Sequence, residues 1–113
     1  MLNKKNSFND FIDCAEFFVS EKYTSPDRLC ASGASAGGLL MGVIANEKPK
    51  LFAVIIADVP WVDCVTTMLD STIPLTTNEY DEWGNPNDKE VFDYILSYSP
   101  YDNVKQVEYP AML

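Results

Sequence analysis

The sequence has no histidine, and basic residues and cysteines are scarce among its 113 residues. Without histidine the chain lacks both a common metal ligand and the usual general base. Its three cysteines form no C-x-x-C pair, so the sequence predicts no metal site. Only 8 basic residues stand against 17 acidic ones, and the net charge is -9. A surface that binds nucleic-acid phosphates needs the opposite sign, so the charge argues against a nucleic-acid partner.

Long apolar runs are also absent. No run approaches the roughly 20 residues that a membrane span needs, and the N-terminal segment MLNKKNSFND has no apolar core of signal-peptide length. We read Cys14, Cys30 and Cys64 as free thiols that pack as small hydrophobic side chains in a reducing compartment. The expectation is a cytoplasmic protein with no membrane partner, and nothing in the sequence indicates a cofactor.

The chain does have enough apolar residues for a core, with 47% hydrophobic and 12% aromatic residues. Apolar positions at helical spacing predict an amphipathic helix that ends near Tyr23 and begins at a capping box formed by Ser7 and Asp10. A strand over 28–34, a buried helix over 36–47 and a continuously apolar strand over 51–60 follow. This alternation predicts an α/β fold, a parallel sheet with helices on both faces.

The second half of the chain is more polar. It predicts helices over 61–69 and 90–98, separated by a long loop over 70–89 that contains prolines. Loops of this length inside a compact domain usually carry function. The final residues, YPAML, predict the start of another strand.

Residues Gly33-Ala34-Ser35-Ala36-Gly37 fit G-x-S-x-G, the nucleophile elbow of serine hydrolases. An elbow holds its serine in a strained turn between a strand and a helix, and Gly33 and Gly37 would relieve the crowding there. The backbone N–H of Ala36, at the start of the following helix, could then donate to a developing oxyanion. On this reading Ser35 is the nucleophile.

Two alternatives stay open on the pattern alone. A strand, a glycine-rich turn, a helix and a second strand ending at Asp58 also suit a dinucleotide site. The fingerprint of that site, G-x-G-x-x-G, requires glycine at the position that Ser35 occupies. In the other alternative, Gly33, Gly37 and Gly38 only allow the helix to pack closely on the strand.

Six segments carry a resemblance that extends beyond the turn. They are FNDFIDCAEFF, YTSPDRL, GASAGGLLMG, ADVPWVDCVTTMLD, IPLTTNEYDEWGNPND and SYSPYDNV. From about Lys5 to Leu113 the sequence resembles the catalytic domain of the prolyl oligopeptidase family of serine peptidases, and within it the branch that cleaves after basic residues. The resemblance implies that residues 1–113 form part of an α/β-hydrolase domain. In the intact enzyme that domain faces a β-propeller that admits only short peptides.

The resemblance also implies roles for individual residues. Ser35 would be the nucleophile and the Ala36 N–H one oxyanion donor, while the second donor is a tyrosine hydroxyl upstream of this segment. The triad acid and histidine are expected beyond Leu113. The family usually has glycine where this chain has Ala34. An alternative is that Asp58 or Asp63 is the triad acid. The competing interpretation is that both carboxylates are solvated or cap a helix.

Acidic residues in the segment NEYDEWGNP imply the specificity. In the family they select a Lys or Arg side chain before the scissile bond, and they map onto Glu79 and Asp81. The aromatic neighbours Tyr80 and Trp83 could flank the apolar stem of that side chain. The function implied is a serine-type peptidase that cleaves short basic peptides after Arg or Lys. The alternatives are another hydrolase on the same fold, either an esterase or a different oligopeptidase, and a non-catalytic α/β domain that binds nucleotides.

Overall fold

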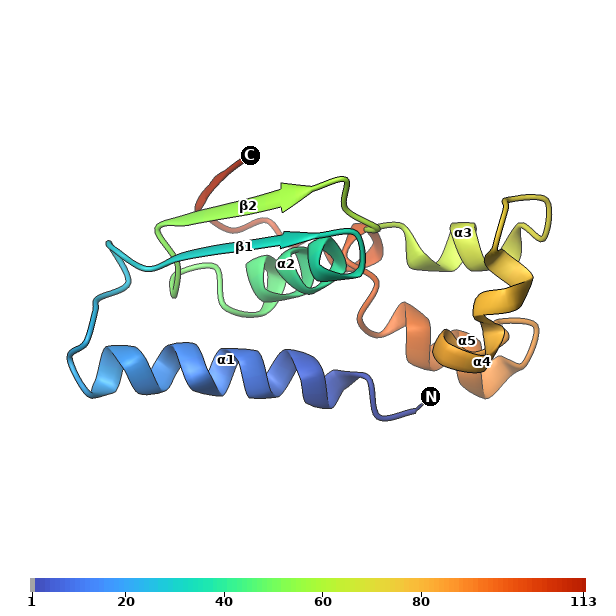
Figure 1. Cartoon of the computed structure of the whole chain (residues 1–113), viewed down its shortest axis with the longest axis horizontal. Helices are drawn as coiled ribbons and strands as arrows, with labels where there is room; N and C mark the ends of the chain where they lie inside the picture. The colour runs from blue at the N-terminus through green and yellow to red at the C-terminus, as the bar shows by residue number, and fades with distance from the viewer. Residues whose placement is uncertain (1) are drawn as a thin grey trace.

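The computed structural model describes residues 2–113 and is built around a three-stranded parallel sheet (Figure 1). The strands are β1 (Cys30–Ala34), β2 (Val54–Asp58) and β3 (Ala111–Met112), in the order β1-β2-β3. Ala34 at the end of β1 pairs with Asp58 at the end of β2, and Val54 pairs with Ala111. The predicted α/β fold with a parallel sheet is confirmed.

Within residues 2–113, five helices accompany the sheet: α1 (Lys5–Ser20), α2 (Ala36–Glu47), α3 (Cys64–Leu69), α4 (Tyr80–Trp83) and α5 (Lys89–Leu96). Two short 3-10 helices, η1 (Thr76–Glu79) and η2 (Tyr101–Asn103), lie among them. Figure 1 shows α1 and α2 on the same side of the sheet, with α3, α4 and α5 gathered beyond the carboxyl ends of β1 and β2.

The two faces of the sheet differ in burial. Ala31 and Ile55 are buried against α2, whereas their neighbours Ser32 and Ile56 are exposed. Because side chains alternate along a strand, this pattern means that one face is packed and the other is open. The helices of residues 2–113 therefore cover one face of the sheet, not both.

Helix α2 joins the two parts of the core. One cluster lies between the sheet, α1 and α2: Ile12, Ala15, Ala31, Met41, Ile44, Ala45, Phe52 and Ile55. The other lies between α2 and the helices beyond the sheet: Phe8, Leu39, Val43, Cys64, Val65, Met68, Trp83, Val91, Ile95 and Tyr98. A helix that contributes to both clusters must be apolar on nearly every side, as the sequence of α2 is.

Three predictions about element boundaries need correction. The capping box is wrong, because α1 begins at Lys5, Lys4 occupies the N-cap without a side-chain bond, and Ser7 lies inside the helix. The helix expected from residue 61 begins only at Cys64, because the Asp63 carboxylate accepts from the Thr66 N–H at 3.1 Å and caps it there. The expected loop over 70–89 contains η1 and α4.

All three cysteines are free thiols, as predicted. Packing as a small hydrophobic side chain is correct only for Cys64, which is fully buried and whose pKa is raised to about 12 by that burial. Cys14 and Cys30 are exposed, Cys14 on α1 and Cys30 at the start of β1. Across residues 2–113, none of the helices is long and apolar enough to cross a membrane.

Candidate active site

Ser35 is the single residue between β1 and α2, and its backbone is in an unusual conformation. Its φ is 55° and its ψ is -117°, a backbone conformation that residues other than glycine rarely adopt. Its amide donates to the Asp58 carbonyl at 3.1 Å, and its carbonyl accepts from the amides of Leu39 and Trp61 at 3.1 and 3.3 Å. The side chain is exposed, which is what a nucleophile elbow requires.

The glycines around Ser35 differ in how closely other atoms approach them. A Cβ on Gly33 would lie 2.4 Å from the Gly37 carbonyl oxygen, and a Cβ on Gly38 would lie 2.6 Å from Pro60 Cα. A Cβ on Gly37 would meet nothing within 4 Å in residues 2–113. The prediction that glycine relieves crowding at the turn is therefore correct for Gly33. It is wrong for Gly37, since no atom of residues 2–113 would crowd a Cβ there. The extra methyl group of Ala34 is exposed, so the turn accommodates it.

Ala36 is the first residue of α2, a helix of 12 residues. The first N–H groups of a helix have no acceptor within it, and the helix dipole makes this end electropositive. The Ala36 N–H is therefore suited to receive negative charge that develops next to the Ser35 hydroxyl.

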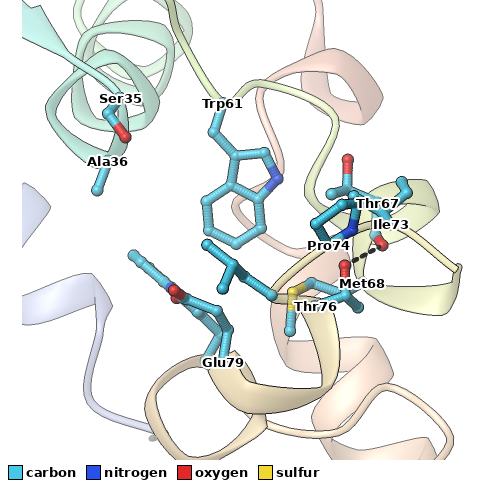
Figure 2. Close-up of a pocket in the computed structure, with 11 residues that line it drawn as sticks. Ser35, Ala36, Trp61, Thr67, Met68, Ile73, Pro74, Thr76 and Glu79 are labelled. Carbon is cyan, nitrogen blue, oxygen red and sulfur yellow. Dashed lines mark hydrogen bonds between the residues drawn. The ribbon is translucent and has the colours of Figure 1, made fainter. Parts of the chain in front are cut away.

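A pocket of about 210 Å³ opens beside these two residues (Figure 2). Ser35 and Ala36 lie at one side of it and Glu79 at another, with Trp61 alongside. The remaining wall comes from the segment that follows β2: Thr67, Met68, Ile73, Pro74, Leu75, Thr76 and Trp83. The pocket is thus an apolar cavity with a hydroxyl, a helix N-terminus and one carboxylate on its wall.

The Glu79 carboxylate is half-buried and held in place by a tryptophan. The Trp83 indole Nε1–H donates to Glu79 Oε2 at 2.7 Å. Trp83 in turn packs edge-to-face on Trp61, with ring centroids 4.6 Å apart. One carboxylate oxygen is fixed by this bond, and the other remains available to a ligand between aromatic walls.

The other residues considered from the sequence lie elsewhere. Asp81 is exposed on α4 and is not part of the pocket wall. Asp58 is exposed at the end of β2, where its backbone carbonyl, and not its side chain, contacts Ser35. The capping role is correct for Asp63. Residues 2–113 contain no group of three or more His, Cys, Asp or Glu side chains that could hold a metal ion.

Sequence reasoning identified only part of the aromatic wall. Trp83 was expected to flank the stem of a basic side chain and does line the pocket, Tyr80 was expected beside it and is not part of the wall, and Trp61 was not considered. Trp61 and Trp83 are 22 positions apart, and only the path of the chain after β2 brings their rings together. A usable signal was present, because tryptophan is rare in this chain and both copies fall in segments that carry the family resemblance.

Comparisons with known proteins agree with this geometry. The sequence model of the prolyl oligopeptidase family matches residues 1–113. Dipeptidyl aminopeptidase BI of Pseudoxanthomonas mexicana is 60% identical over 112 residues, which are 99% of this chain and 16% of that protein. Oligopeptidase B of Leishmania major superposes with a TM-score of 0.97 at 56% identity, and the match covers 99% of this chain and 16% of that structure.

A second solved structure is equally similar. Oligopeptidase B of Trypanosoma brucei, determined with covalently bound antipain, matches with a TM-score of 0.97 at 54% identity, again over 99% of this chain and 16% of the other. The chain thus spans about one sixth of the length of the relatives it matches. With a family match over its whole length, and the strand–serine–helix turn in place, the chain belongs to the prolyl oligopeptidase family.

Proposed function

We propose that a full-length protein containing this sequence, called the full-length protein below, is a serine peptidase that uses Ser35 as its nucleophile. One observation carries the proposal: an exposed serine in a strained turn and a helix N-terminus share a pocket with a half-buried carboxylate. Each of these groups suits one part of peptide hydrolysis.

The reaction divides between this segment and the rest of the full-length protein. Ser35 Oγ attacks the scissile carbonyl while a base takes its proton, and the Ala36 N–H donates to the oxyanion that forms. The sequence contains no histidine, so we assign the base, and the acid that orients it, to other parts of the full-length protein. The protonated base then gives its proton to the leaving amine, and water hydrolyses the acyl-enzyme.

The substrate we propose is a short peptide with Arg or Lys before the scissile bond. A cation that leaves water needs a carboxylate partner, and Glu79 offers its second oxygen inside the pocket. The apolar stem of Arg or Lys suits the aromatic wall formed by Trp61 and Trp83. The Trp83 ring already holds Lys4 Nζ 4.4 Å from its centroid, so the substrate cation would pair with Glu79 and not with this ring. Asp81, on the surface of α4, would add only longer-range attraction.

Two further parts of the proposal follow from the family resemblance and the composition. A β-propeller elsewhere in the full-length protein would restrict entry to short peptides. The cytoplasm is the proposed location, and the support for it is that all three thiols are free.

Matched substitutions test the proposed specificity. Glu79→Gln in the full-length protein removes the carboxylate that lines the pocket, and it should lower kcat/KM for an arginyl arylamide by about 10- to 100-fold. A neutral arylamide should change by less than about 3-fold, because it has no cation to pair. Asp81→Asn removes the same charge outside the pocket and should also cost less than about 3-fold.

Two results would count against this assignment. Equal losses in the Glu79 and Asp81 variants would mean that overall charge, and not contact in the pocket, selects the substrate. If the unsubstituted full-length protein prefers proline or a neutral apolar residue before the scissile bond, the proposed specificity for Arg or Lys is contradicted. The serine peptidase assignment would survive that result.

A further inference from the structure

We propose that the turn after β2, residues 58–61, is a positioning device for the nucleophile. This inference rests on the proposed role of Ser35. The turn holds both backbone polar groups of that residue: the Asp58 carbonyl accepts from the Ser35 amide at 3.1 Å, and the Trp61 amide donates to the Ser35 carbonyl at 3.3 Å. The orientation of the elbow therefore depends on a segment more than twenty residues further along the chain.

Val59, in the middle of this turn, is in a conformation that its own sequence disfavours. Its φ is 39°, although it is β-branched and precedes a proline, and both properties restrict the backbone. Within residues 2–113 its side chain is 74% exposed, so these residues do not bury the valine in compensation for the strain. The turn must be held by contacts of its neighbours, and the two bonds to Ser35 are among them.

Pro60 supplies a third contact by packing against the first turn of α2. A Cβ on Gly38 would lie 2.6 Å from both Pro60 Cα and Pro60 Cβ, so only glycine permits this approach. The contact seats the turn on the same helical turn whose N-terminus carries the Ala36 amide. The same turn therefore positions both the Ser35 hydroxyl and the Ala36 oxyanion donor.

Trp61 extends this device to the substrate. It ends the turn with its amide bound to Ser35, and its indole ring lines the pocket (Figure 2). The same ring packs on Trp83. The strained turn at Val59 therefore fixes the nucleophile and one wall of the pocket relative to each other. Errors of about 1 Å in such a placement can cost about 100-fold in rate.

Two substitutions at Val59 separate its conformation from its side chain. Val59→Pro forces φ to about -65°, which is incompatible with the turn, whereas asparagine tolerates positive φ. In the full-length protein, Val59→Pro should slow covalent labelling by diisopropyl fluorophosphate about 100-fold. Its melting temperature should fall, because proline cannot adopt the native φ at this position, so labelling is measured well below the onset of unfolding. Val59→Asn should label within about 3-fold of the parent rate, because it keeps the turn.

A second variant applies if Val59→Pro does not fold. In Gly38→Ala the new methyl group on α2 would push Pro60, and with it the turn, away from the helix. This variant should slow labelling at least 10-fold in protein that remains folded. Folded Val59→Pro or Gly38→Ala protein that labels at the parent rate, with labelling dependent on Ser35, would overturn this inference alone. Labelling that survives Ser35→Ala would instead overturn the proposed function, and this inference with it.

Discussion

Replacing Ser35 by alanine in the full-length protein is expected to lower kcat/KM for an arginyl arylamide by about 10⁴-fold or more. The substitution removes the attacking oxygen and leaves the pocket and the Ala36 amide in place. Stability should hardly change, because the Ser35 side chain is exposed and makes no capping hydrogen bond to α2. Steady-state kinetics and a melting curve on the same preparation test both halves of the expectation.

A tenth of the parent activity in the Ser35→Ala protein would contradict the nucleophile assignment. The close packing of Gly33 and Gly38 would then be the better account of the glycine-rich turn. Loss of activity together with a large drop in melting temperature would point to the same account, because an exposed nucleophile should not contribute to stability.

The 113-residue chain alone is expected to show no peptidase turnover. It has no histidine to serve as the base, and one face of its sheet is open. Strands β1 and β3 are both edge strands, and apolar residues such as Ile56 and Leu113 are 37% and 85% exposed. Open edges and apolar surface favour association between chains, so we also expect the isolated chain to aggregate or to remain partly molten.

Arylamide hydrolysis, size-exclusion chromatography and binding of a hydrophobic dye test this expectation together. Turnover of an arginyl arylamide by the purified chain, abolished by Ser35→Ala, would contradict it. A monodisperse chain without dye binding would contradict the second part, and it would mean that the covered face of the sheet is enough for folding.

Elements with a strong apolar pattern were predictable, and so were both ends of α2, whereas the starts of α1 and α3 were not. The α2 run and the apolar run of β2 define a helix and a strand without further information, because each is a nearly unbroken apolar pattern of the length typical of its element. The start of α3 depends on the Asp63 side chain capping a turn, and the start of α1 on a turn formed by Asn3 and Lys4. Each start depends on one or two hydrogen bonds, and these cannot be read from a periodic pattern.

The candidate site divides in the same way. Ser35, Ala36 and Gly33 were predictable because the elbow is local, with all its parts within five residues. Glu79 required the family resemblance, since a lone acidic residue in a polar segment is usually solvated. The contact of Gly38 with Pro60 joins residues 22 positions apart, and no local pattern encodes it.

The bond between Trp83 and Glu79 and the strained backbone of Val59 are visible only in the three-dimensional structure. The bond from Trp83 to Glu79 follows from the short helices η1 and α4, in a segment that the sequence presents as a loop. The positive φ of Val59 has no sequence signal, because the residue is β-branched and precedes a proline, both of which argue against it. Contacts between distant segments overrule such local preferences.

Peptide mapping of the covalent adduct is the most direct test of Ser35 as nucleophile. The full-length protein would be inactivated with diisopropyl fluorophosphate, digested and analysed by mass spectrometry. We predict a single labelled peptide that contains Ser35, with labelling lost in Ser35→Ala and blocked in advance by an arginyl substrate analogue. A label on a different serine, or inactivation without a label on Ser35, would contradict the account.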